Sequence, residues 1–146
     1  MSLLPSPFGL QNTGAICYLN SLIQALVSCP VFCTTIVKQS GGKTEICEEF
    51  HHFISDIFTK DDDRTKKNIT QFSRRLSIEL NKHIMRNTKK SFTGQQCASE
   101  ALRHLIDAID PKSNCGIKDL FTSRWKCVLD CDKCKHPSEV FDTTTM

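Results

Sequence analysis

The stretch "GLQNTGAICYLNSLIQALVSCP", Gly9 to Pro30, joins a turn-rich segment to a cysteine and then to an apolar stripe. The apolar residues after Cys17 recur at the spacing of one helical face; they are Leu19, Leu22, Ile23 and Leu26. Pro30 marks the end of this helix. The stretch therefore predicts an amphipathic helix with Cys17 in its first turn.

A thiol in this position is expected to ionise more readily than an ordinary cysteine thiol. Unpaired backbone N–H groups and the positive end of the helix dipole lie beneath Cys17, and both favour thiolate over thiol. Gly14 allows backbone angles that other residues avoid. The amide of Asn12, across the turn, could stabilise an oxyanion, an effect of about 3–4 kcal/mol in acyl transfer. A cysteine beside an apolar helix is more often a buried filler, so the nucleophile hypothesis depends on Asn12 and Gly14.

Three further segments carry apolar residues at helical spacing: residues 48–59, 70–84 and 95–110. Thr93 and Gln96 have the spacing of a capping box at the start of the last segment, and Pro111 follows its end. Residues 37–44 and 59–68 are expected to be loops.

The pattern changes beyond Pro111. Residues 123–131 alternate, which places Trp125, Cys127 and Leu129 on one face of a strand, and a second short strand is expected at residues 140–141. We therefore predict an α+β fold, with a helical region over residues 1–110 and the beginning of a β region over residues 111–146. Two strands alone are marginally stable, so the β region is expected to be incomplete.

Composition restricts the partners and the compartment. The 146 residues carry a net charge of +3 with both signs interspersed, and no apolar run is long enough to span a membrane. We therefore expect neither nucleic acid nor a membrane as a partner. The nine cysteines are an odd number and no signal peptide precedes them, which favours a reducing compartment, the cytoplasm or the nucleus.

Three blocks of the sequence resemble one family. Residues 9–26, "GLQNTGAICYLNSLIQAL", resemble the cysteine box of the ubiquitin-specific proteases, which are papain-like cysteine deubiquitinases. Residues 93–102, "TGQQCASEAL", resemble the glutamine box of the same family. Residues 120–142 resemble the entry into its fingers subdomain, with the first zinc-ribbon pair at Cys131 and Cys134. The blocks occur in the order of the family.

The resemblance implies a fold of thumb, palm and fingers. This chain would supply the mainly helical, papain-like thumb and the start of the β-rich fingers, and it would be truncated before the palm. Cys17 would attack the C-terminal glycine carbonyl of ubiquitin in a peptide or isopeptide bond, and Asn12 would hold the oxyanion. Gln96 and Glu100 on the glutamine-box helix would bind the basic ubiquitin tail. Ubiquitin or a ubiquitinated protein is the implied partner.

The sequence departs from the family pattern at the site itself. Cys97 stands where the family usually has an acidic residue that contacts the ubiquitin tail, so one charge-assisted hydrogen bond is expected to be lost. The general base of the family is a histidine on the palm, downstream of this chain. None of the five histidines here has that setting: His51, His52, His83, His104 and His136. We therefore expect the isolated chain to be inactive.

The zinc pair is also only half of a site. Cys131 and Cys134 supply two of four tetrahedral ligands; Cys127 and His136 could complete the set, although Cys127 is expected in the core. The chemistry itself would need no cofactor. Two alternatives stay open beside the incomplete enzyme: a non-catalytic ubiquitin- or partner-binding remnant, and a small zinc-stabilised helical protein with a relic cysteine box.

Overall fold

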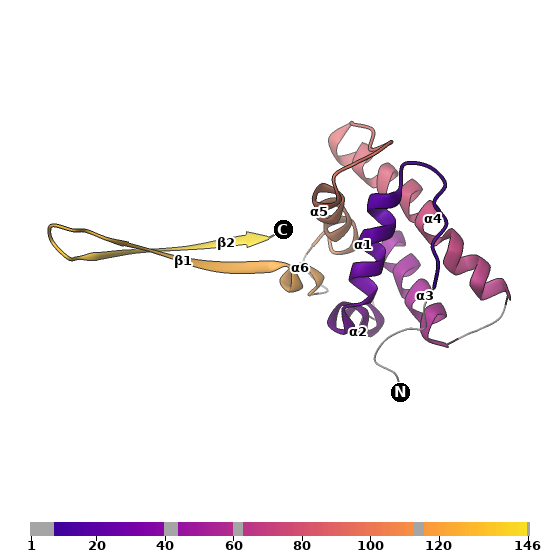
Figure 1. Cartoon of the computed structure of the whole chain (residues 1–146), viewed down its shortest axis with the longest axis horizontal. Coiled ribbons are helices and arrows are strands. Elements are labelled where there is room, and N and C mark those ends of the chain that lie inside the picture. The colour runs from indigo at the N-terminus through magenta and orange to yellow at the C-terminus, as the bar shows by residue number, and fades with distance from the viewer. Residues whose placement is uncertain (1–7, 40–43, 60–62, 113–115, 146) are drawn as a thin grey trace.

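A computed structural model describes residues 8–39, 44–59, 63–112 and 116–145 of the chain. Figure 1 shows a body of packed helices from which one long hairpin projects. The helices are α1 (Cys17–Val27), α2 (Pro30–Lys38), α3 (Glu45–Thr59), α4 (Asp63–Thr88), α5 (Ala98–Ile109) and α6 (Ile117–Leu120). The strands are β1 (Thr122–Asp130) and β2 (Pro137–Thr145). The predicted α+β class is confirmed.

Aromatic rings form the centre of the helical body. The rings of Phe53 on α3 and Phe72 on α4 stack with their centroids 4.0 Å apart. Phe50 meets Phe72 edge to face at 5.1 Å, and Phe32 on α2 meets Phe50 in the same way at 5.7 Å. The predicted apolar stripe of α1 is buried against this core. Each helical stripe read from the sequence is therefore covered by a neighbouring helix.

Three local predictions need correction. Pro30 follows the end of α1, but it also opens α2, because the fixed φ of proline suits the first turn of a helix. Helix α4 begins at Asp63, so the part of the predicted 59–68 loop from residue 63 onward is helical. The predicted capping box does not form, because Gln96 Nε2 donates to the backbone oxygen of Thr93 at 2.6 Å and Cys97 occupies the N-cap of α5.

The short helix α6 fixes the base of the hairpin to the body. Gly116 has a φ of +73°, a left-handed conformation that favours glycine, and Ile117 directly after it is fully buried. The buried carboxylate of Asp110 accepts a hydrogen bond from the Lys118 N–H at 3.2 Å. The hydroxyl of Thr122, the first residue of β1, donates to the Lys118 carbonyl at 2.8 Å. Helical structure thus extends past residue 110, into the segment predicted to open the β region.

The hairpin is antiparallel, with Trp125 opposite Asp142 and Cys127 opposite Val140. This register confirms that Trp125, Cys127 and Leu129 share one face of β1. The expectation that Cys127 lies in the core is wrong, because its side chain is exposed. The reason is visible in Figure 1, where the hairpin points away from the helices and no described segment forms a second layer over it.

Among the residues that the structure describes, no single helix is long and apolar enough to span a membrane. Helices α1 and α2 together reach the length and composition of a span, but an 84° bend separates them. The buried side chains of both helices belong to the core of the helical body.

Candidate active site

The segment before Cys17 is anchored to α4. The Gln11 N–H donates to the Thr70 carbonyl at 2.9 Å, and the Ser73 hydroxyl donates to the Gln11 carbonyl at 3.2 Å. Gly14 then turns the chain with a φ of +138°, where an added Cβ would be strained although the space around it is open. The predicted role of Gly14 in the turn is thus supported by its backbone conformation.

The first turn of α1 leaves donors available beside an exposed thiol. The carbonyl of Ile16 accepts from the N–H groups of Leu19 and Asn20, both at 3.0 Å. In the described part of the chain, the N–H groups of Cys17 and Tyr18 have no acceptor. The Cys17 side chain is exposed. A negative charge that develops next to the sulfur would therefore meet two unpaired backbone donors and the positive end of the helix.

Asn12 lies exposed in the segment that leads to this turn, and no hydrogen bond among the described residues occupies its amide. Asn20, one turn after Cys17, differs from Asn12 because its side-chain oxygen is buried. This Oδ1 atom has no partner among the described residues. An unsatisfied buried oxygen costs about 1–3 kcal/mol, so this atom is suited to accept a donor from outside the described contacts. The sequence reading did not single out Asn20, because polar residues on a helix give no sign of burial.

An aromatic bridge connects α1, which begins at Cys17, to α5. The ring of Phe92 meets Tyr18 of α1 at 6.3 Å and His104 of α5 at 5.3 Å, both edge to face. The Phe92 N–H donates to Asn81 Oδ1 of α4 at 2.7 Å, which fixes the loop. Burial, and then the neighbouring Cys17 thiolate, raise the pKa of the Tyr18 hydroxyl. The bridge was missed from sequence because its three rings belong to segments far apart in the chain.

The start of α5 presents a second exposed thiol. Cys97 is the N-cap residue, and the backbone N–H groups of Glu100 and Ser99 lower the pKa of its thiol. Glu100 is exposed in the first turn, with its carboxylate 4.0 Å from His104 Nε2, and Gln96 is half-buried just before the helix. The sequence reading treated Cys97 only as a lost carboxylate and missed that its N-cap position acidifies the thiol.

The histidines lie on α3, α4, α5 and in the hairpin turn: His51, His52, His83, His104 and His136. In the described part of the chain, no hydrogen bond, ion pair or ring contact joins any of them to Cys17. His83 instead contacts the Asn87 amide at 2.9 Å, and burial lowers its pKa, an effect that Asp107 opposes. The described residues therefore bring together an exposed thiol and two unpaired backbone donors, and no described contact adds a histidine to them.

Two comparisons with known proteins identify the family. The family model described as "Ubiquitin carboxyl-terminal hydrolase" matches residues 8–144. The chain belongs to this family. It is also 28% identical, over 145 residues, to the mouse (Mus musculus) protein named "Ubiquitin carboxyl-terminal hydrolase 17-like protein E". The matched region covers 92% of this chain and 26% of that relative, so the chain spans about a quarter of the relative's length.

This member of the ubiquitin carboxyl-terminal hydrolase family carries its cysteine pair at the hairpin tip. The backbone N–H and the thiol of Cys134, with the N–H of Lys133, lower the pKa of the Cys131 thiol. The described residues contain no cluster of three or more His, Cys, Asp or Glu side chains that could hold a metal. Cys127 and His136 are thus not gathered around the pair. The thiols suit zinc chemically, but they do not make up a complete tetrahedral site.

Two depressions lie on the helical body of this family member. One, of about 290 Å³, lies between the turn at Ala15 and Ile16 and the loop at Phe92 and Thr93. The other is a groove of about 520 Å³ between α3 and α4, with Ile78 and Lys82 shared by both.

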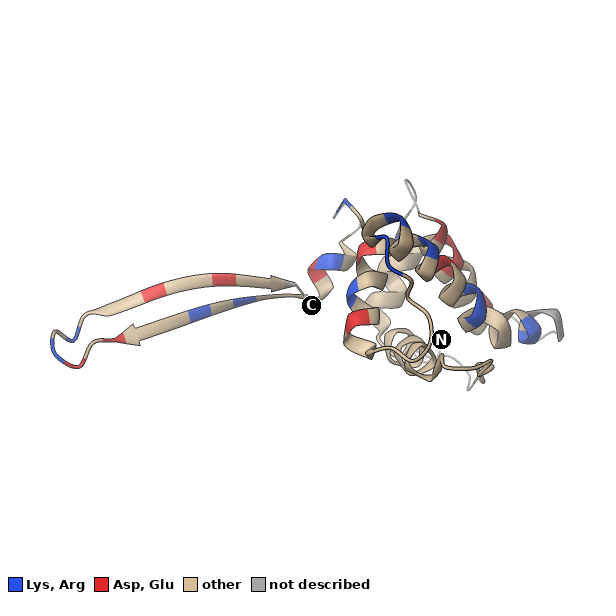
Figure 2. Ribbon diagram, turned by 90° about the horizontal axis from the view of Figure 1, so that it is seen from above, with Lys and Arg blue, Asp and Glu red and all other residues tan. Residues whose placement is uncertain are grey.

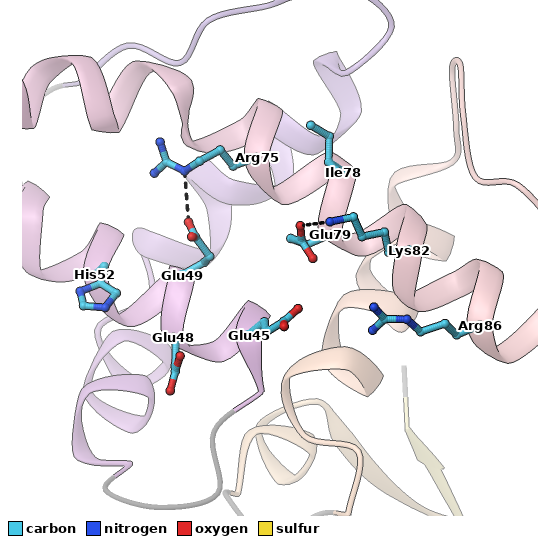
Figure 3. Close-up of a pocket in the computed structure, with 9 residues that line it drawn as sticks. All are labelled: Glu45, Glu48, Glu49, His52, Arg75, Ile78, Glu79, Lys82 and Arg86. Atoms are coloured by element: carbon cyan, nitrogen blue, oxygen red, sulfur yellow. Dashed lines mark hydrogen bonds and ion pairs between the residues drawn. The ribbon is translucent and has the colours of Figure 1, made fainter.

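Figure 3 shows that charged side chains line the larger groove and that several pair with each other. Arg75 lies 3.2 Å from Glu49, and Lys82 lies 2.6 Å from Glu79. The residues lining this groove include neither a thiol nor a hydroxyl, whereas the start of α1 presents the exposed thiol of Cys17.

Proposed function

We propose that this chain carries the nucleophile and part of the ubiquitin-tail site of a cysteine deubiquitinase. One observation supports the proposal most strongly: the exposed thiol of Cys17 stands at the start of α1, where the backbone N–H groups of Cys17 and Tyr18 have no acceptor in the described part of the chain. Membership of the ubiquitin carboxyl-terminal hydrolase family supports the reaction class.

In the proposed reaction, the Cys17 thiolate attacks the carbonyl carbon of the C-terminal glycine of ubiquitin. A carbon–sulfur bond forms, and the carbonyl oxygen becomes an oxyanion. The N–H groups of Cys17 and Tyr18 and the amide of Asn12 donate to that oxyanion. The carbon–nitrogen bond then breaks as the leaving amine takes a proton, and water later releases ubiquitin from the sulfur.

The start of α5 is the proposed contact for the basic tail of ubiquitin. Glu100 is exposed there, with one charge to offer to an arginine or lysine, and Gln96 precedes it with a side-chain amide. Cys97 lies between the two and carries an acidified thiol. A Cys97 thiolate would attract the same cations as a carboxylate, although a sulfur accepts weaker hydrogen bonds than an oxygen.

Proton transfer is the step that the isolated chain lacks in this proposal. No described contact places a histidine beside Cys17, so neither activation of the thiol nor protonation of the leaving amine has a partner. The same observation favours a second function, in which this chain binds ubiquitin or another partner without turnover. Both functions use the start of α5, and they differ only in the role of Cys17.

The proposed chemistry requires no cofactor. Any zinc at Cys131 and Cys134 would be structural, with the remaining ligands supplied from outside this pair. The cytoplasm or the nucleus suits a chain with a thiol nucleophile and many free cysteines.

Two assays separate the functions. Purified chain is incubated with an isopeptide-linked ubiquitin dimer, and we expect no cleavage. Ubiquitin binding is then measured by titration, where Glu100→Arg should weaken binding several-fold and Glu45→Arg, in the first turn of α3, should not. Equal effects of the two substitutions would contradict the proposed tail site. Cleavage of the dimer that Cys17→Ala abolishes would contradict the proposal that the isolated chain supplies no general base.

A further inference from the structure

The hairpin of β1 and β2 carries an apolar face that nothing in the described part of the chain covers. Residues paired directly across an antiparallel ladder lie on one face, and this register groups Trp125, Cys127, Leu129 and Val140. Trp125 is 62% exposed and Leu129 is 63% exposed. These side chains would gain cross-strand contacts from a further strand paired with β1, and a hairpin that is marginal by itself would gain stability from it.

The opposite face of the hairpin is already stabilised by its own contacts. Lys126 Nζ lies 2.7 Å from the carboxylate of Glu139 and 5.8 Å from the ring centroid of Phe141. Arg124 and Asp130, near the two ends of β1, make no ion pair with any described residue. They are the charges of β1 that remain available to a partner.

The two strands differ in the charges along their free edges. Figure 2 shows basic bands on the part of β1 near the body and an acidic band near the tip, whereas β2 carries acidic bands alone. These charges are Arg124, Lys126 and Asp130 on β1, and Glu139 and Asp142 on β2. Two antiparallel copies of β1 would oppose unlike charges, whereas two copies of β2 would oppose only acidic and neutral residues.

We propose that a second copy of this chain pairs with β1 edge to edge and antiparallel, in the register centred on Cys127. Arg124 then lies opposite Asp130 of the second copy, and this contact occurs twice by symmetry. Trp125 lies opposite Leu129 of the second copy, again twice. The result is a four-stranded sheet in the order β2-β1-β1-β2, with the apolar faces of both hairpins on the same side.

Neighbouring registers are less favourable. A shift of the pairing by one residue places the face of Trp125 and Leu129 of one hairpin level with the charged face of Lys126 and Glu139 of the other. A register centred on Lys126 puts two lysines opposite each other, and cross-strand like charges are destabilising. A register centred on Val128 moves the partner of Arg124 out of the strand, to Asp132 in the turn. It also places Lys126 opposite Asp130, but Lys126 is already paired with Glu139 of its own hairpin. The register centred on Cys127 pairs residues 124–130 with unlike charges at both ends.

The shape of the molecule allows this contact. Figure 1 shows the hairpin extending away from the helices, so the free edge of β1 is accessible along most of its length. Nine residues of strand span about 30 Å. Antiparallel pairing places the two helical bodies at opposite ends of the shared sheet. An open strand edge is also the feature through which sheets associate most readily.

The test uses the single tryptophan of the chain, which is Trp125. Sedimentation and Trp125 fluorescence are recorded over a dilution series under reducing conditions. We expect a dimer that dissociates on dilution, with the emission moving to the red as Trp125 becomes exposed. Arg124→Glu should weaken the dimer by about tenfold or more, because two unlike pairs become two like pairs.

The double variant Arg124→Glu/Asp130→Arg restores unlike charges at both contacts, and it should recover the dimer. Lys90→Glu, on the exposed surface of the helical body, makes the same change of charge and should have no effect. A monomer at every concentration would overturn the proposal. So would a dimer that Arg124→Glu leaves intact, or one that the double variant fails to restore.

Discussion

The helical body and the hairpin use similar apolar side chains under opposite conditions. Phe72, on α4, is fully buried against two aromatic rings of α3, whereas Phe141, on β2, is 72% exposed. Each helix of the body has another helix opposite its apolar stripe, whereas none of the described residues forms a second layer over the hairpin (Figure 1). An apolar pattern therefore determines which face an element buries, and only its neighbours determine whether that face is buried at all.

The largest expected effect is a loss of unfolding free energy when an aromatic ring of the helical body is removed, with no comparable loss for a ring of the hairpin. Phe72→Ala should lower the free energy of unfolding by about 3–5 kcal/mol, because it leaves a cavity among buried rings. Trp125→Ala should change the unfolding free energy of the monomer by less than about 0.5 kcal/mol, because the Trp125 ring is already exposed there. Urea unfolding followed by far-UV circular dichroism measures both, and similar losses would contradict the division between body and hairpin.

A second prediction compares thiols inside and outside the body. Cys33 is buried, its thiol donates to the Val27 carbonyl at 3.3 Å, and burial raises its pKa to about 11. Cys97 is exposed and its pKa is lowered by backbone N–H groups. At pH 7.5 we expect Cys97 to react with iodoacetamide more than about a hundredfold faster than Cys33. Mass spectrometry of timed digests gives both rates, and comparable rates would be inconsistent with these environments.

The turn before Cys17 gives a third and smaller effect. Gly14 has a φ of +138°, so Gly14→Ala should cost about 1–3 kcal/mol of strain or shift the turn. Gly9→Ala is the matched control, because no atom would lie within 4 Å of its added Cβ and its φ lies outside the left-handed region. Thermal unfolding should separate the two variants by several degrees. A Gly14→Ala variant as stable as Gly9→Ala would show that the turn does not need glycine.

The smallest effect concerns pH. Burial lowers the pKa of His83 in the folded chain, so the unfolded chain takes up this proton first as the pH falls. The stability associated with neutral His83 is present above about pH 6.5 and is lost below it, as the pH approaches the lowered pKa. His83→Gln should therefore reduce the drop in melting temperature between pH 7.5 and pH 5. An unchanged drop would place the acid sensitivity elsewhere.

The sequence predicted the elements whose signal is local. The stripes of α1, α3, α4 and α5 have a 3.6-residue period, and the alternation around Trp125 has a period of two. Most residues on the helical faces are buried as these patterns predict, although Phe58 of α3 is 38% exposed and Ala98 of α5 is exposed. Helix α2 was missed because a proline was read only as an end. The exposure of Cys127 was missed because it depends on the absence of a covering layer, which no local pattern encodes.

The candidate site was predictable to the same extent. A short stretch of six residues contains Asn12, Gly14 and Cys17, so the local sequence is enough to predict that they lie together. The contacts of Phe92 with Tyr18 and His104 join three segments distant in sequence, and they depend on how α1, α4 and α5 pack. The acidified thiol of Cys97 depends on where α5 starts, and the predicted capping box placed that start too early.

The central claim is that Cys17, and not the acidified Cys97, is the nucleophile toward ubiquitin. A ubiquitin probe with a C-terminal electrophile is incubated with the wild-type chain, Cys17→Ser and Cys97→Ser, and the modified peptide is located by mass spectrometry. We expect weak labelling of the wild type on Cys17, no labelling of Cys17→Ser, and labelling of Cys97→Ser at a similar rate. Labelling on Cys97 that persists in Cys17→Ser would contradict the account.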